Sequence, residues 1–137
     1  MIVVDTNIIV YLYIESGHST QAEQALEKDT QWAAPLLWRS EFRNVLALYI
    51  RKNLLSLDEA QKIMQEAMFL MKGREYEVAS FQVLELVASS ECSGYDCEFV
   101  ALAEDLGLSL VTVDKKILKE FPQIAVSLDE YIVNQGK

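Results

Sequence analysis

The chain has 137 residues, of which 51% are hydrophobic and 24% are charged, and its formal net charge is −9. This length and apolar content suit one compact core, so we expect residues 1–137 to form a single domain. The acidic balance argues against a protein that holds nucleic acid on a broad basic surface, because such a surface needs many Lys and Arg residues to neutralise phosphates. It leaves nuclease chemistry open, since bound divalent cations reverse the local sign at clustered carboxylates.

The amino-terminal segment argues against a secreted or membrane protein. Its apolar run is interrupted early by Asp5 and Asn7 and carries no basic residues ahead of it, unlike a signal peptide or a membrane helix. We therefore expect a cytoplasmic protein without membrane contact. Cys92 and Cys97 have neither zinc-ligand spacing nor the pattern of a disulfide framework, so we expect buried, reduced thiols.

Apolar periodicity predicts strands alternating with helices along the chain. In chain order the expected elements are a strand at 2–5, helices at 6–16 and 20–28, a strand at 31–35, helices at 36–52 and 56–73, a strand at 75–80, helices at 80–91 and 95–106, a strand at 108–114, a helix at 115–120, a strand at 124–126 and a last helix after 127. This alternation predicts an α/β fold, a three-layer α/β/α sandwich with a mostly parallel central sheet.

Several helix ends carry their own signals. A hydroxyl residue followed three positions later by Glu is typical of a capping box, which marks the start of a helix. This pattern occurs three times, at Thr20 and Glu23, at Ser56 and Glu59, and at Ser127 and Glu130. Gly73 and Gly107 follow the expected fourth and sixth helices and predict left-handed residues that end them.

Two acidic residues follow the most apolar strands of the expected sheet. Asp5 comes directly after Ile-Val-Val, and Asp114 comes after Leu-Val-Thr-Val. Open α/β sheets bind ligands beyond the carboxyl ends of their strands, which favours a functional role for both residues. The alternative is that each caps the helix that follows it.

Two further acids fall on helix faces that should be buried. Glu41 lies within the apolar arc of the helix at 36–52, and Asp96 stands one turn before Phe99 and Val100. A buried carboxylate is costly unless it pairs with a cation, binds a metal or takes up a proton. The alternatives are a salt bridge from Glu41 to Arg39 or Arg43, and a helix-capping role for Asp96.

The four carboxylates together indicate a site for a hard divalent cation, Mg²⁺ or Mn²⁺, because they offer only oxygen ligands. With one histidine the chain has no Ser-His-Asp or Cys-His set, and it has no glycine-rich phosphate loop. The chemistry that remains is attack of a metal-activated water on a phosphodiester bond.

These motifs also resemble a known family. The opening Ile-Val-Val-Asp-Thr-Asn, the Ser40-Glu41 pair and the block from Tyr95-Asp96 to Asp114 closely resemble the PIN-domain family, in particular the toxin ribonucleases of VapBC toxin–antitoxin systems. The resemblance implies an endoribonuclease that uses Mg²⁺ or Mn²⁺, forms homodimers and is silenced by a cognate antitoxin. It assigns the metal to Asp5, Glu41, Asp96 and Asp114, with Asn7 and Thr112 as supporting polar residues. The cations nearest these acids in sequence, and so the candidates for contacting RNA, are Arg39, Arg43, Lys115, Lys116 and Lys119.

Two other functions are compatible with the sequence. One is a PIN nuclease that serves RNA processing and is not a toxin. The other is a non-catalytic α/β binding module, such as a receiver-like domain, although the single Asp5 replaces the acidic pair that a receiver carries after its first strand.

Apolar side chains predict two interaction surfaces. An antitoxin groove is expected on the amino-terminal helices because large apolar side chains exceed what the core needs there. These side chains are Tyr11, Tyr13, Trp38, Tyr49, Met64, Met68, Phe69 and Met71. A homodimer contact is expected at Phe121, Tyr131, Ile132 and Val133.

Overall fold

A five-stranded parallel sheet forms the centre of the computed structural model, which describes residues 1–133. The strand order is β3-β2-β1-β4-β5, so the first strand lies in the middle of the sheet. Val3 pairs with Ala33 on one side and with Leu110 on the other. The strands are β1 (Ile2–Val4), β2 (Trp32–Pro35), β3 (Glu75–Tyr76), β4 (Leu110–Thr112) and β5 (Ala125–Ser127).

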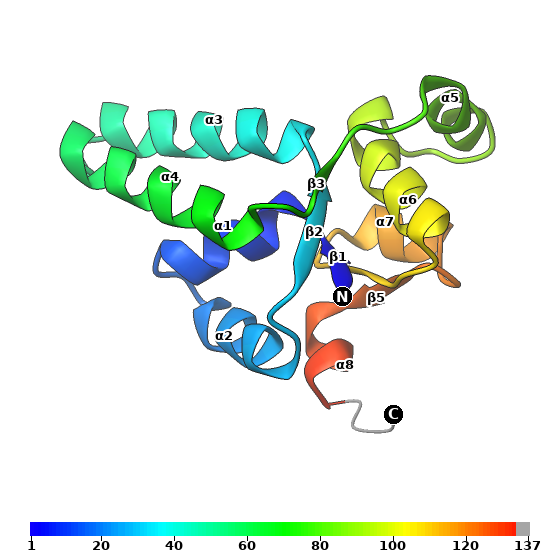
Figure 1. Ribbon diagram of the computed structural model, residues 1–137, viewed down its shortest axis with the longest axis horizontal. Coiled ribbons are helices and arrows are strands. Elements are labelled where there is room, and N and C mark those ends of the chain that lie inside the picture. The colour runs from blue at the N-terminus through cyan, green and yellow to red at the C-terminus, as the bar shows by residue number, and fades with distance from the viewer. Residues whose placement is uncertain (134–137) are drawn as a thin grey trace.

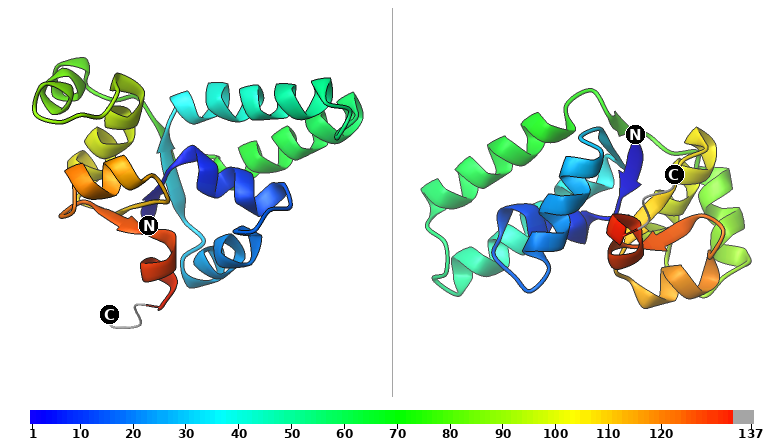
Figure 2. Two further views of the ribbon diagram at one scale, coloured as in Figure 1. Left: turned by 180° about the vertical axis from the view of Figure 1, so that it is seen from behind. Right: turned by 90° about the horizontal axis from the view of Figure 1, so that it is seen from below.

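Helices cover both faces of this sheet, as the sequence predicts. The chain winds from β1 to β3 in one direction and then returns through β4 to β5 in the other, so right-handed crossovers place the two sets of helices on opposite faces. Figure 1 shows α1 (Thr6–Tyr13), α2 (Ser19–Lys28), α3 (Leu37–Arg51) and α4 (Leu57–Met71) on one side, and α5 (Ser80–Ala88), α6 (Gly94–Leu106) and α7 (Lys115–Glu120) on the other. The short α8 (Leu128–Val133) packs against α2 (Figure 2). The predicted three-layer α/β fold is confirmed.

The core lies between the sheet and these helices. The strand residues Val3, Val4 and Val111 are fully buried, as parallel strands covered on both faces should be. Trp38 and Phe42 of α3 pack edge to face, with ring centroids 5.6 Å apart. Cys92 and Cys97 are free and buried, which confirms the expectation of reduced core thiols.

The predicted capping boxes have three different outcomes. Ser56 and Glu59 form the complete reciprocal pair, with bonds of 2.8 and 3.1 Å, and begin α4. Ser127 accepts a hydrogen bond from the Glu130 amide at 3.1 Å. The box at Thr20 is wrong, because α2 begins at Ser19 after the N-cap His18.

The physical reason lies in the turn that precedes α2. The Ser19 hydroxyl accepts a hydrogen bond from the Ser16 amide at 2.9 Å and bonds the Ile14 carbonyl at 3.3 Å. Ser19 thereby closes the connection from α1, and the helix starts one residue before the position that the Thr20 pattern indicates.

Most of the other differences are shorter elements. The strand predicted at 75–80 is reduced to Glu75–Tyr76, and the helices predicted at 6–16 and 80–91 end at Tyr13 and Ala88. Gly107 adopts the expected left-handed conformation (φ 67°) at the end of α6. Gly73 is also left-handed (φ 83°), one residue beyond the cap of α4. Within residues 1–133 no helix has the length and apolar character needed to cross a membrane.

Part of the predicted surplus of apolar side chains belongs to the core. Trp38 and Met71 are fully buried, so their assignment to an exposed groove is wrong, while Phe69 is 80% exposed. At the carboxyl-terminal end Phe121 is buried and Val133 is 69% exposed. The remaining predicted groove residues, Tyr11, Tyr13, Tyr49, Met64 and Met68, are half-buried.

Candidate active site

Asp5 is held at the centre of the sheet edge by its neighbours on two strands. It follows β1, and its Oδ1 accepts a hydrogen bond from the Thr6 amide at 2.8 Å. Its Oδ2 accepts a hydrogen bond from the hydroxyl of Thr112 at 2.8 Å, which comes from the adjacent strand β4. Because β1 and β4 are parallel, their carboxyl ends meet at the same edge of the sheet. Thr112, which was predicted as a supporting residue, lies there and bonds Asp5.

Glu41 reaches the same edge from α3. Its Oε1 accepts a hydrogen bond from the Thr6 hydroxyl at 2.6 Å, although the two residues are 35 positions apart in sequence. The alternative of a salt bridge to Arg39 or Arg43 is wrong among the described residues. Arg39 donates two hydrogen bonds to Glu75, at 2.6 and 2.7 Å, and Arg43 bonds the Ser40 hydroxyl.

Asp114 caps α7 and also faces the site. Its Oδ1 accepts hydrogen bonds from the amides of Lys116 and Ile117, at 2.8 and 3.1 Å, so the alternative of a helix cap is correct for this oxygen. Its own amide bonds the Thr112 hydroxyl at 3.0 Å. Thr112 therefore contacts both Asp5 and Asp114.

Asp96 lies in the first turn of α6 and is not its cap. Ser93 is the N-cap residue, and its hydroxyl accepts a hydrogen bond from the Asp96 amide at 3.0 Å. The capping alternative for Asp96 is therefore wrong. The carboxylate of Asp96 also interacts with Ser93, which lowers its pKa in part, and Asp96 lines the same pocket as the other three acids.

All four predicted carboxylates line one pocket of about 280 Å³. The pocket brings together acids from the ends of β1 and β4 and from helices on both faces of the sheet. Its lining residues are Asp5, Thr6, Asn7, Glu41, Asn44, Val45, Asp96 and Asp114. Thr6 and Asn44 were not predicted as site residues from the sequence. Asn44 could have been found, because it lies three residues after Glu41 and so shares its helix face.

Burial and mutual repulsion make three of these carboxylates, Asp5, Glu41 and Asp96, harder to ionise. Burial raises the pKa of Asp5 from 3.8 to about 6, against the hydrogen bonds from Thr112 and Thr6, and the charges of Glu41 and Asp96 raise it further. Burial also raises the pKa of Glu41, and burial followed by the charge of Asp114 raises that of Asp96. The pocket is therefore a place where added positive charge would be favourable.

The cations predicted to contact RNA differ in the contacts that they make. The charge of Lys116 acts on Asp96 and partly opposes the rise of its pKa. The guanidinium of Arg39 is paired with Glu75, whereas Arg43 is exposed and bonded to Ser40. The remaining two candidates are exposed on α7: Lys115 and Lys119.

The chemistry of the pocket suits a hard divalent ion. The side chains that line it offer carboxylate, amide and hydroxyl oxygens, and they lack sulfur and imidazole ligands. Within residues 1–133 no three His, Cys, Asp or Glu side chains close around a single point as a preformed cage. Mg²⁺ does not need such a cage, because it commonly keeps several water ligands and takes one or two carboxylates. The donor set therefore fits Mg²⁺ or Mn²⁺.

Comparison with known proteins places this arrangement in a family. Residues 2–124 match the family model of the PIN domain. The chain belongs to the PIN domain family. The PIN domain is also similar to a protein named Ribonuclease VapC3 from Pyrobaculum aerophilum, with 30% identity over 126 residues that cover 90% of this chain and 96% of the relative. The family resemblance expected from the sequence is confirmed.

Solved structures share the same fold at low sequence identity. PAE2754 from Pyrobaculum aerophilum has a TM-score of 0.76 and 20% identity, covering 96% of this chain and 93% of the other. A toxin–antitoxin complex from Klebsiella pneumoniae has a TM-score of 0.70 and 20% identity, covering 93% and 98%. FitAcB from Neisseria gonorrhoeae has a TM-score of 0.73 and 18% identity, covering 93% and 96%. At these identities the likeness establishes the fold.

Proposed function

We propose that this PIN domain is a divalent-metal-dependent endoribonuclease that hydrolyses RNA phosphodiester bonds. The observation that carries the proposal is the convergence of Asp5, Glu41, Asp96 and Asp114 on one pocket. Within residues 1–133 none of these acids forms an ion pair that would account for its position. The name of the relative, Ribonuclease VapC3, supports RNA as the substrate.

Each acid would contribute differently to holding the metal. Both oxygens of Asp5 accept hydrogen bonds within the protein, so this carboxylate is the most rigidly oriented ligand. Oε2 of Glu41 and Oδ2 of Asp114 accept no hydrogen bond from any residue in the described part, and each is therefore available to an ion or its water. Asp96 of α6 would be the fourth ligand, on the face of the sheet opposite to Glu41 of α3.

A bound divalent ion would supply positive charge to the phosphate and lower the pKa of a coordinated water. The side chains of the pocket orient that chemistry. Thr6 fixes Glu41, and Thr112 fixes Asp5, so that neither carboxylate must be reordered when the substrate enters. Asn7 and Asn44 place amide groups on the pocket wall, where they can donate hydrogen bonds to phosphate oxygens.

We further propose that the protein is the toxin of a toxin–antitoxin pair, which the relative and the complex from Klebsiella pneumoniae support. A hollow of about 650 Å³ between α1 and α4 would receive an amphipathic segment of a cognate antitoxin. It is lined by Tyr13, Gln65, Glu66, Phe69, Leu70 and Arg74. We also propose a homodimer in the cytoplasm, which light scattering at high micromolar concentration would test; a monomer under those conditions counts against it.

The decisive experiment measures RNA cleavage by the wild type and by the Asp96→Asn variant, each with Mg²⁺, with Mn²⁺ and with a chelator. We expect cleavage only by the wild type with metal, and a circular dichroism spectrum of the variant equal to that of the wild type. Cleavage that persists in the variant or in chelator contradicts the proposal. Tight RNA binding without cleavage under all conditions would instead favour a non-catalytic binding module.

A further inference from the structure

An aromatic pair lies on the surface near the acidic pocket. The ring of His18 stacks on the ring of Tyr11, with centroids 4.6 Å apart and planes inclined by 30°. His18 is exposed, whereas Tyr11 is half-buried beneath it. The imidazole therefore presents an aromatic surface to the solvent while its position is set by the tyrosine.

The pair sits one helical turn from the pocket. Asn7, which lines the pocket, and Tyr11 are four residues apart on α1 and so share one helix face, about 6 Å apart along the helix axis. The charge of Asp5 reaches Tyr11 and, after burial, is the second cause that raises the pKa of its hydroxyl. A nucleotide chain with a phosphate in the pocket would therefore pass close to the rings.

Hydrogen bonds hold the backbone that carries the imidazole, and the ring itself contacts Tyr11. The amide of His18 donates a hydrogen bond to the Ser16 hydroxyl at 3.1 Å, and the amide of Ser16 bonds the Ser19 hydroxyl at 2.9 Å. The turn also joins two helices that pack against each other, α1 and α2 (Figure 1). A ring that is already ordered loses little conformational entropy when a ligand stacks on it.

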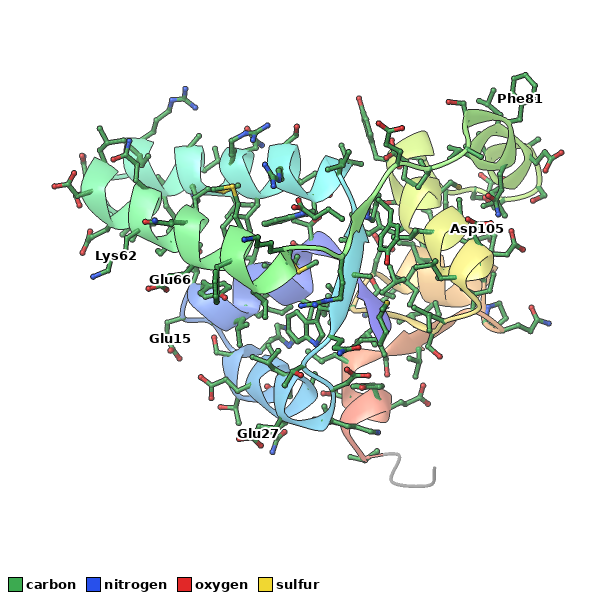
Figure 3. All side chains as sticks on the ribbon, viewed as in Figure 1. Glu15, Glu27, Lys62, Glu66, Phe81 and Asp105 are labelled. Atoms are coloured by element: carbon green, nitrogen blue, oxygen red, sulfur yellow. The ribbon has the colours of Figure 1, made fainter. Side chains whose placement is uncertain are left out.

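The surface charge increases the need for such a contact. The labelled carboxylates Glu15, Glu27, Glu66 and Asp105 extend away from the ribbon on several sides of the molecule (Figure 3). A protein with a net charge of −9 gains little from general attraction to phosphates. Stacking on an aromatic ring does not depend on charge, and single-stranded RNA commonly exposes its bases to such rings.

We propose that the Tyr11–His18 pair is a base-binding site that stacks one unpaired RNA base next to the phosphate held in the acidic pocket. This inference rests on the proposed ribonuclease function and deepens it. It assigns a role in substrate binding to His18, the single histidine of the chain, without giving it any part in the hydrolysis itself.

The test compares RNA binding by His18→Ala and His18→Phe, each in the Asp96→Asn background with Mg²⁺ present. The probe is a short, unstructured, fluorescein-labelled oligoribonucleotide, and the readout is fluorescence anisotropy over a range of salt concentrations. Phe81→Ala is the matched control, because Phe81 is an exposed ring, 83% accessible, on α5 across the sheet (Figure 3). Thermal melting of each variant reports any loss of folding.

We expect His18→Ala to weaken RNA binding by about 5- to 150-fold, the range for loss of one base–aromatic stack. The slope of affinity against salt should stay the same, since no phosphate contact is lost. His18→Phe should bind within about 2-fold of the parent, because it keeps the ring. Phe81→Ala should bind like the parent.

Two results would overturn the inference. One is His18→Ala binding that equals that of the parent, and the other is His18→Phe binding as weak as that of His18→Ala. Cleavage of the same RNA by the otherwise wild-type protein separates the two proposals. Cleavage without dependence of binding on His18 contradicts only the base-binding site, whereas His18-dependent binding without any cleavage contradicts only the nuclease. A parent protein that does not bind RNA also overturns the inference.

Discussion

Replacing Asp5 with Asn should destabilise the metal-free PIN domain at acidic pH and stabilise it at neutral pH. The pKa of Asp5 rises from 3.8 to about 6 on folding, chiefly because the carboxylate is buried. The folded state then binds the proton more tightly than the unfolded chain, so ionisation of Asp5 removes stability as the pH rises from about 4 to 6. Above about pH 6 the ionised Asp5 therefore lowers the free energy of unfolding by roughly 3 kcal/mol.

The substitution removes this penalty and loses one hydrogen bond. The Asn side chain keeps an oxygen for the Thr6 amide, but its second group cannot accept the proton of the Thr112 hydroxyl, a loss of about 1 kcal/mol. We therefore expect Asp5→Asn to be about 1 kcal/mol less stable than the wild type below pH 4 and about 2 kcal/mol more stable above pH 7. A change of 1 kcal/mol should move the melting temperature by about 3 °C in a domain of this size.

The measurement is chemical denaturation of both proteins in chelator at several pH values from 4 to 8. Asp29→Asn is the matched control of opposite sign. Burial raises the pKa of Asp29, but hydrogen bonds from the terminal amino group and the Gln31 amide outweigh it and lower the pKa overall. Asp29→Asn should lower the free energy of unfolding at neutral pH, and this loss should become smaller as the pH falls. If the free energy of unfolding of Asp5→Asn differs from that of the wild type by the same amount at every pH, the proposed effect of Asp5 ionisation is refuted.

Three further substitutions or reactions test other parts of the structure. Thr6→Val removes the 2.6 Å hydrogen bond to Glu41, so kcat for RNA cleavage should fall on the order of 10-fold. Thr6→Ser keeps the hydroxyl and should restore kcat. Equal kcat values for the wild type and both variants would exclude a positioning role for Thr6. Ser56→Ala breaks the capping box of α4 and should cost about 1 kcal/mol in urea denaturation, and an unchanged midpoint would contradict this. Burial raises the pKa of Cys92 to about 11 and also raises that of Cys97. Iodoacetamide at pH 8 should therefore modify the two thiols quickly only in denaturant, as measured by mass spectrometry. Fast labelling of the native protein would contradict this prediction.

The acids of the pocket could be found from the sequence because each breaks a local pattern. Asp5 and Asp114 end apolar strands, and parallel strands end at a common edge of the sheet. Glu41 and Asp96 stand on helix faces that otherwise read as apolar, and helical periodicity detects such a mismatch. These signals are short in range, so one sequence suffices to find them.

The partners of the charged and polar groups could not be found in this way. The Arg39 guanidinium bonds Glu75 across 36 positions, and Thr6 bonds Glu41 across 35, so both contacts depend on how the helices are placed against the sheet. The start of α2 was missed for a related reason. The Ser19 hydroxyl serves the turn before the helix, and a capping pattern that begins at Thr20 carries no information about that turn.

The central position of β1 has a consequence for when the protein can become active during its synthesis. The strand made first receives one of its two neighbours, β4, only after more than a hundred further residues, and that neighbour brings both Thr112 and Asp114. A nascent chain that ends before β4 lacks one carboxylate and the hydroxyl that orients Asp5, whatever else has already folded. Pairing over such a distance along the chain is also slow, because a long loop must close first. Any activity that needs all four carboxylates is therefore delayed until the chain has been made as far as Asp114.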